Sequence, residues 1–433
     1  MIADRGHVAG RDWTWVARLG SLALIACVFG GCTGQAAAGD VARSNASRAG
    51  GSAPDARQAA SAINAFGFDL YRTTTSADGN EVFSPTSIVM ALAMARAGAA
   101  GATASQMDSV MRAAYGSGNG NGLNSLDQAL AGLSRSYADP RGTQQAVSLH
   151  ITNAAFGQRG LQLRQPYLDA LASRFDAGLQ LADFAGDPKG SCQRIDDWVS
   201  SQTEGRIPAL LSQLDSSTRL VLANAIYLKA PWQAAFLPEG TTDSPFTRLD
   251  DSQVAVPTMS QELEIGTYAS GAGWQAAELG YVGGSLAMTL VLPDDLLAFE
   301  KKLNADLFDQ VTAALRRVPG ELTLPRFKTE TRTDLIQTLS EMGMPSAFDA
   351  TEADFSGITD QERLFISDVI HQANISVDEK GTEASAATAV VMAVATAPPG
   401  RVTFHVDRPF IFAVRDRDTG AILFLGRIVD PTV

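Results

Sequence analysis

Residues 378–400 read DEKGTEASAATAVVMAVATAPPG, and their chemistry sets them apart from the rest of the chain. No charged residue lies between Glu383 and Arg401, and most side chains are small or β-branched. Residues 390–394 have strong strand propensity. An exposed stretch of this kind pairs readily with any open sheet edge and is an aggregation hazard. We therefore expect the segment either to be buried or to work by inserting into a sheet as a strand.

A period of two gives this segment two different faces. One face has only small or apolar residues, namely Thr382, Ala384, Ala386, Thr388, Val390 and Met392. The other face begins with Glu383 and tolerates a charge. Such a strand can lie in a sheet with one side on a core and the other toward water. The alternative is a short amphipathic helix or a loop, because alanine also favours helix.

The composition of the 433-residue chain excludes several classes of protein. It is 45% hydrophobic and 19% charged, which rules out a disordered, collagen-like or multi-span membrane protein. A net charge of -13 argues against nucleic-acid partners. Three cysteines exclude a disulfide scaffold, and four histidines leave little room for a metal centre. G-x-S-x-G, H-E-x-x-H, C-x-x-C and phosphate-loop motifs are absent from the sequence, so an enzyme has no candidate site.

The N-terminus predicts export. Basic residues precede an apolar run that ends at Cys32, which fits a secretory signal with a bacterial lipoprotein processing site. Cys27 is an alternative lipidation site, and plain secretion after cleavage near residues 36–38 is a third possibility. We predict a signal peptide over 1–31 and an envelope-anchored or secreted protein. Residues 32–60, rich in Ala, Gly and Ser, are predicted to form a flexible tether.

The remaining residues, 61–433, are predicted to form a single α+β domain, because helices and strands mix without strict alternation. A buried helix is expected at 88–97 and an amphipathic surface helix at 194–203. Strands are expected at 220–228, 286–292, 364–366, 402–406, 410–414 and 422–428.

Several motifs together resemble the serpin family of serine protease inhibitors. Residues 379–389 are similar to the hinge of inhibitory members. Four further motifs follow the family's order: VFSPTSIVMALAM at 82–94, DDWV to TEGRI at 196–207, TRLVLANAIYLK at 218–229, and DRPFIF to FLGRIVDP at 407–431. The resemblance implies a serpin fold, with a large central mixed sheet, two smaller sheets, surrounding helices and an exposed reactive-centre loop over about 379–400.

The resemblance also implies roles for particular residues. The hinge comprises Glu379, Gly381, Thr382, Glu383, Ala384, Ser385, Ala386 and Ala387. The shutter, a polar cluster that lets the central strands part, comprises Ser84, Ser87, Asn224 and His371. Hydrogen bonds suit such a cluster, because they exchange at lower cost than close apolar packing. The breach, where the loop first enters the sheet, comprises Trp232, Arg326 and Glu379.

Two positions depart from the family pattern. Asp196 stands where the family favours Asn, and a buried carboxylate there needs a partner or a raised pKa. Arg326 stands where the family often has Lys. Residues 112–141 form no basic stripe, so activation by glycosaminoglycans is not implied.

The implied function is inhibition by a suicide substrate, without enzymatic activity, cofactor or metal. A serine protease cleaves the loop, and the freed arm inserts and traps the acyl-enzyme as a covalent 1:1 complex of a monomeric inhibitor. Counting from Glu379 places the cleaved bond at Ala395-Thr396, with the bonds after Val394 and after Thr396 left open. Ala395 suits elastase-like or subtilisin-like proteases. The alternatives are a non-inhibitory carrier or surface protein of the same fold, and a lipid-anchored hydrolase.

Overall fold

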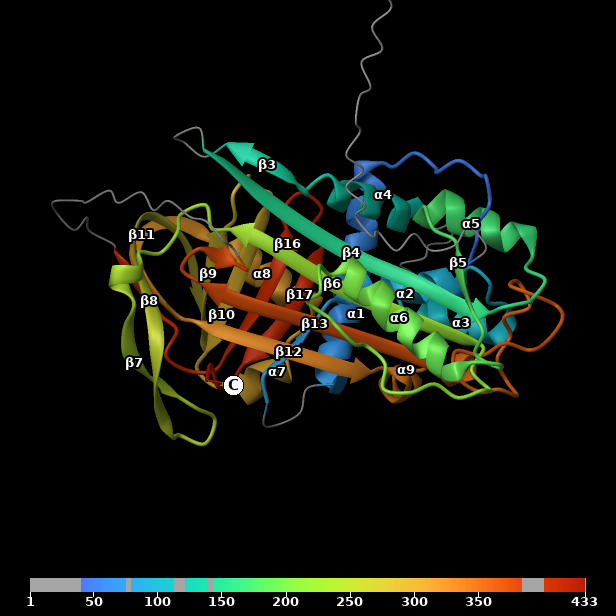
Figure 1. Ribbon diagram of the computed structural model, residues 1–433. Helices are drawn as coiled ribbons and strands as arrows, with labels where there is room; N and C mark the ends of the chain where they lie inside the picture. The colour runs from blue at the N-terminus through green and yellow to red at the C-terminus, as the bar shows by residue number, and fades with distance from the viewer. Residues whose placement is uncertain (1–39, 75–78, 113–120, 139–142, 384–400, 433) are drawn as a thin grey trace, which may run out of the picture. The chain divides into compact units, whose positions relative to one another are not determined.

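The fold is built on two β-sheets in the computed structural model, which describes residues 40–432 except 75–78, 113–120, 139–142 and 384–400 (Figure 1). The main sheet has the strand order β1-β5-β4-β6-β14-β13-β12, and β3 pairs with β4. These strands are β1 (Val41–Ala42), β3 (Arg135–Ala138), β4 (Gln144–Gln158), β5 (Leu179–Ala182), β6 (Leu220–Pro231), β12 (Phe327–Asp334), β13 (Asp368–Asp378) and β14 (Gly381–Thr382). Strand β6 runs antiparallel to β4 and parallel to β13, so the sheet is mixed.

The second sheet has the order β15-β11-β8-β9-β10-β16-β17-β2, and β7 pairs with β8. Its strands are β2 (Glu81–Phe83), β7 (Thr242–Thr247), β8 (Gln253–Gly271), β9 (Trp274–Gly280), β10 (Leu286–Pro293), β11 (Arg316–Pro325), β15 (Val402–His405), β16 (Phe410–Asp416) and β17 (Ile422–Ile428). The long strand β8 pairs with both β11 and β9, so the two smaller sheets implied by the resemblance are joined into one.

The helices of the described chain pack against both sheets. They are α1 (Ala53–Thr74), α2 (Pro85–Arg96), α3 (Gly101–Val110), α4 (Asn121–Ala131), α5 (Gln165–Phe175), α6 (Pro188–Gln202), α7 (Leu296–Glu300), α8 (Ala305–Ala314) and α9 (Ile336–Glu341). Helix α2 contacts β4 and β6 of the main sheet and β17 of the second, and nearly all of it is buried, as its apolar sequence predicts. Ser84 caps α2 by accepting a hydrogen bond from the Ser87 amide, and Pro85 occupies the first turn.

Helix α6 lies across the opposite face of the main sheet, over β4 and β6 (Figure 1). Ile195 and Val199 of α6 pack in a separate apolar cluster with Phe156, Val221 and Ala223 of the sheet. Odd-numbered residues of β6 therefore face α6, whereas Leu222 and Leu228 face the main core. This alternation fixes which hinge residues face each side of the sheet.

Two predictions from the sequence are wrong, one for residues 364–366 and one for residues 40–60. The strand expected at 364–366 is irregular chain, although Leu364 and Ile366 are buried, because regular pairing starts only at Asp368. The flexible tether expected over 32–60 is wrong for residues 40–60. Strand β1 pairs with β5 at the sheet edge, and α1 already begins at Ala53.

Charge pairs explain why residues 40–52 dock despite their lack of hydrophobic periodicity. The Asp40 carboxylate binds Arg194 of α6 at 2.5 Å and Arg159 at 2.7 Å. The hydrogen bond from Arg194 is the main cause of a lowered pKa at Asp40. Arg43 and Arg48 pair with Asp176 and Asp127. In the described part of the chain, no helix is both long enough and apolar enough to cross a membrane.

Candidate functional site

The first hinge residues already lie inside the main sheet. Gly381 and Thr382 form β14 between β6 and β13, with Thr382 opposite Ala230 on one side and Val377 on the other. The Glu383 amide continues this ladder by donating to the Ser376 carbonyl at 3.1 Å. The sequence predicts a strand-forming segment here, but not how far it enters the sheet.

Below β14 the two central strands pair directly with each other. Their parallel pairing runs from Val221 opposite Asp368 to Ile226 opposite Ala373. The sheet is therefore closed at one end and opened by the hinge at the other. The junction between the two regions lies where β6 carries Tyr227.

Gly381 can be occupied only by glycine. Its φ is +145°, and a Cβ built on it would lie 2.2 Å from the Ala230 carbonyl oxygen. Any side chain would therefore force β14 away from β6. The close approach of these two backbones explains why this hinge position needs glycine.

Thr382 is buried on the core side of the sheet, where it is 1% exposed. Its hydroxyl hydrogen bonds to the Tyr281 hydroxyl at 2.7 Å. The Tyr281 ring stacks on Trp232, with centroids 4.5 Å apart and planes 13° apart. Burial raises the pKa of Tyr281, which remains a neutral phenol able to donate or accept.

Trp232 also ties the strand before the hinge to the end of β6. Its indole Nε1 donates to the Asp378 carbonyl at 2.9 Å, and its amide donates to the Lys380 carbonyl at 2.8 Å. The chain turns between Asp378 and Gly381 over the indole. The tryptophan thus fixes the position from which the hinge enters the sheet.

Glu379 is buried beside Arg326, as the resemblance implies. The Arg326 Nε lies 2.8 and 3.0 Å from the two carboxylate oxygens, and Thr241 donates to the same carboxylate. Burial opposes ionisation, but the hydrogen bonds from Arg326 and Thr241 prevail and lower the pKa of Glu379. The carboxylate is therefore ionised and paired. Thr241 was missed because it lies far away in the sequence, in a short loop.

Glu383 is the residue that directly follows β14. Its φ is +47°, a left-handed conformation that costs energy for a residue other than glycine. Its side chain is 10% exposed, and Oε2 lies 3.4 Å from Nε of Arg206. Burial raises the pKa of Glu383, although Arg206, Lys328 and a hydrogen bond with Tyr227 act in the opposite direction.

The four shutter residues predicted from the sequence lie together, with Asn224 and His371 on the central strands β6 and β13 and with Ser84 and Ser87 at the start of α2. The Ser84 amide donates to His371 Nε2 at 3.0 Å, so Nε2 is the acceptor and the proton lies on Nδ1, which bonds to Asn224. Asn224 also bonds to Ser87. Burial lowers the pKa of His371 to about 3, so the ring is neutral.

Asn153 of β4 joins this cluster and was missed. Its amide lies against Ser87 and Asn224, so the cluster connects β4, β6 and β13 through α2. A polar residue within an apolar strand was the signal that could have identified it.

Asp196 has the partners that its burial requires. Its Oδ1 accepts hydrogen bonds from the amides of Leu210 and Leu211, at 2.7 and 2.8 Å. The carboxylate thereby joins α6 to the segment that leads into β6. The departure from the family residue is accommodated by two backbone donors.

The remaining predicted residues lie outside the described part of the chain. These are Ala384, Ser385, Ala386 and Ala387 of the hinge, the Ala395-Thr396 bond and the lipidation candidate Cys32.

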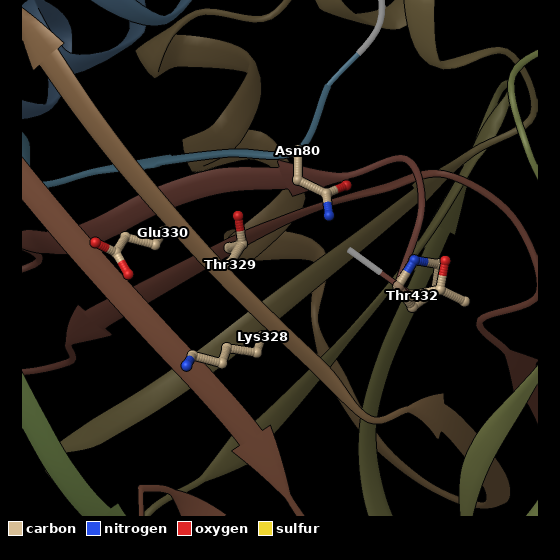
Figure 2. A pocket seen from close by; sticks show the side chains of 6 residues that line it. Asn80, Lys328, Thr329, Glu330 and Thr432 are labelled. Carbon is tan, nitrogen blue, oxygen red and sulfur yellow. The ribbon is translucent and has the colours of Figure 1, made fainter.

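An open pocket of about 540 Å³ is lined by Asn80, Lys328, Thr329, Glu330, Pro431 and Thr432. Figure 2 shows Lys328, Thr329 and Glu330 on one strand of its wall, with Asn80 and Thr432 on separate segments. Across the described ranges, no group of three or more His, Cys, Asp or Glu side chains could hold a metal ion.

Comparisons with known proteins agree with this geometry. A family model described as Serpin (serine protease inhibitor) matches residues 61–431. A serpin-like protein of Thermococcus kodakarensis is 38% identical, over 86% of this chain and 85% of that protein. Leukocyte elastase inhibitor A of Mus musculus is 34% identical, over 86% of this chain and all of the relative.

Solved structures show the same fold. Native tengpin, a thermophilic serpin, has a TM-score of 0.79 at 24% identity and covers 90% of this chain and 100% of its own. Thyroxine-binding globulin in complex with thyroxine has a TM-score of 0.74 at 26% identity, over 86% of this chain and 99% of its own.

Proposed function

This chain belongs to the serpin family, and we propose on that basis that it inhibits a serine protease as a suicide substrate. The supporting observation is the position of Gly381 and Thr382, already paired with both β6 and β13. Strand addition to an open sheet is an established mode of recognition, of which serpin loop insertion is an example. The docked hinge is the start of such an added strand.

The proposed mechanism begins with attack of the protease serine on a bond in the loop, which gives an acyl-enzyme. The freed arm then continues from Thr382 into the closed part of the sheet. As the arm inserts, the hydrogen bonds between β6 and β13 are replaced by hydrogen bonds from the new strand to both of them. The shutter hydrogen bonds must rearrange as β6 and β13 part. The attached protease is pulled with the arm, and distortion of its oxyanion hole slows deacylation by orders of magnitude.

The proposed targets are proteases with shallow primary pockets, of the elastase or subtilisin type. Two sequence features support this proposal, Ala395 as the residue before the cleaved bond and the absence of Arg and Lys between Glu383 and Arg401. The relative from Mus musculus, named leukocyte elastase inhibitor A, points to the same class. We further propose a monomeric inhibitor, exported and anchored through Cys32.

The test is incubation of the mature chain with elastase and, separately, with subtilisin, followed by denaturing electrophoresis and intact-mass spectrometry. We expect a 1:1 adduct that survives denaturant and a released fragment that begins at Thr396. Cleaved inhibitor beside fully active protease, without adduct, would contradict the proposal and favour a carrier of the thyroxine-binding globulin kind. A fragment that begins at Ala395 or Ala397 would keep the mechanism and move the bond.

A further inference from the structure

We propose that Arg206 is a positioning residue for strand insertion: it holds Glu383, the residue directly after β14, and so keeps the start of the inserted strand formed before a protease arrives. The inference rests on the proposed function, because strand insertion matters only if the loop is cleaved by a target. The loop after α6, which carries Arg206, thereby has a role that no hinge, shutter or breach residue fills.

The loop that carries Arg206 is held rigidly on the sheet. The Gly205 amide donates to Ser200 of α6 at 2.8 Å, and the Arg206 amide donates to Thr203 at 2.9 Å. The next residue, Ile207, is fully buried. The Arg206 backbone is therefore fixed relative to α6, while its side chain is 52% exposed and lies across the sheet surface.

Two contacts direct this side chain to the hinge. The guanidinium carbon of Arg206 lies 5.8 Å from the centre of the Tyr227 ring, on the face of β6 that α6 covers. Its Nε lies 3.4 Å from Oε2 of Glu383. Because Tyr227 follows the last residue of β6 that pairs with β13, the ion pair lies at the junction between the closed and opened parts of the sheet.

Glu383 is in an unfavourable position without this partner. Its backbone is left-handed, its side chain is nine-tenths buried, and Oε2 accepts no hydrogen bond from the described part of the chain. Without Arg206, the carboxylate would keep the hydrogen bond with Tyr227 and the charges of Lys328 and Lys229 but would lose its ion pair, which favours exposure to water and withdrawal of the hinge from the sheet. The charge of Arg206 offsets that tendency.

The same pair is compatible with the next step of insertion. Thr382 faces the core, so strand alternation places Glu383 on the opposite face, where Arg206 lies. When Glu383 changes from the left-handed to the extended conformation, the chain can continue into the sheet with the carboxylate on the same side. Lys328 and Lys229 also act on Glu383, so loss of Arg206 has a graded effect.

The first test is hydrogen exchange followed by mass spectrometry on the intact mature chain. In Arg206→Ala we expect faster exchange at the amides of Thr382 and Glu383, with partial protection retained in Arg206→Lys. The control is Arg164→Ala, which removes an arginine of similar exposure whose ion pair with Asp360 spans 3.2 Å at the surface. Unchanged protection in Arg206→Ala would overturn the proposal.

The second test counts the inhibitor molecules consumed per protease inactivated, the stoichiometry of inhibition. Arg206→Ala should raise it about two- to fivefold, as expected for a partly exposed ion pair, and Glu383→Gln, which removes the buried charge together with the pair, should raise it less. The initial rate of loop cleavage should stay within about twofold. The double variant Arg206→Glu with Glu383→Arg should recover part of the loss, which a merely structural role would not.

The outcomes separate the two proposals. If the wild-type chain forms an adduct and Arg206→Ala has the wild-type stoichiometry, the positioning role is wrong and the proposed function stands. If the wild-type chain forms no adduct with either protease, the proposed function is wrong and the positioning role falls with it.

Discussion

The hydroxyls of Tyr281 and Thr382 share a hydrogen bond of 2.7 Å in a fully buried site, between the turn after β9 and the first inserted residue of the hinge. Because Tyr281 stacks on Trp232, the depth of the hinge is linked to the residues at the entrance of the sheet. The contact joins the docked start of the loop to the second sheet. It therefore stabilises the state from which insertion begins.

Tyr281→Phe should weaken this docked state. The substitution leaves the Thr382 hydroxyl buried without its partner, which costs about 1–3 kcal/mol unless the hinge withdraws. We expect a lower melting temperature and faster hydrogen exchange at Thr382. Tyr268→Phe is the matched control, because it removes a 3.1 Å hydrogen bond to Gln275 in the second sheet. Equal exchange at Thr382 in the Tyr281→Phe variant and the wild type would show that the contact does not hold the hinge.

Thr382→Arg should convert the inhibitor into a substrate. The side chain faces the core, and an unpaired charge there costs several kcal/mol. Insertion should become slower than deacylation, with at least about a tenfold rise in the stoichiometry of inhibition, while cleavage of the loop continues. Thr382→Val is the control, since it keeps the size without the charge. A persistent denaturant-stable adduct in Thr382→Arg would count against insertion at this position.

Glu379→Lys should open the entrance of the sheet. It replaces a buried, paired carboxylate with a second positive charge beside Arg326. We expect the free energy of unfolding to fall by about 1–3 kcal/mol. The effect is smaller than for a fully buried pair, because Arg326 is half exposed. Size-exclusion chromatography after mild heating should show polymers, whereas Asp360→Lys at the surface should stay monomeric. A Glu379→Lys chain that stays monomeric on heating would show that the ion pair between Glu379 and Arg326 does not keep the entrance of the sheet closed.

The neutral state of His371 predicts a pH dependence of stability. Its pKa is about 3 in the folded chain and about 6.5 when unfolded, so protonation favours the unfolded state. Stability should be level above pH 6.5 and fall as the pH drops from 6.5 toward 3, by up to about 1.4 kcal/mol per pH unit. Unfolding of the wild type and His371→Gln between pH 4 and 8 measures this contribution. Parallel pH profiles for the two proteins would mean that His371 does not remain neutral in the fold.

Part of this site could be predicted from the sequence and part could not. Ser84, Ser87 and Asn224 belong to motifs that follow the family's order, Glu379 lies at a fixed spacing from the hinge glycine, and the resemblance assigns His371 to the same cluster. Their convergence is therefore expected once the family is recognised. Tyr281 and Thr241 lie in turns that no local pattern marks, and their partners are brought close only when the sheets pack. Arg206 lies in the motif at 196–207, but the motif does not reveal its contact with Glu383.

The docked segment 40–52 and the docked hinge were unpredictable for different reasons. The edge pairing of β1 with β5 and the ion pairs of Asp40 depend on residues more than a hundred positions away, so a polar segment without periodicity resembled a tether. The depth of the hinge depends on the balance between opening β6 from β13 and burying Glu383. The strand propensity of the hinge sequence does not predict that balance.

Inhibition by strand insertion requires that the uncleaved chain has a higher free energy than the cleaved, fully inserted state. The most direct measurement is the melting temperature of the chain before and after a single cut within residues 390–397. We expect the cut chain to melt at least about 10 °C higher, because the new strand adds hydrogen bonds on both sides, each contributing about 1 kcal/mol. A cut chain that melts at or below the temperature of the intact one would contradict strand insertion.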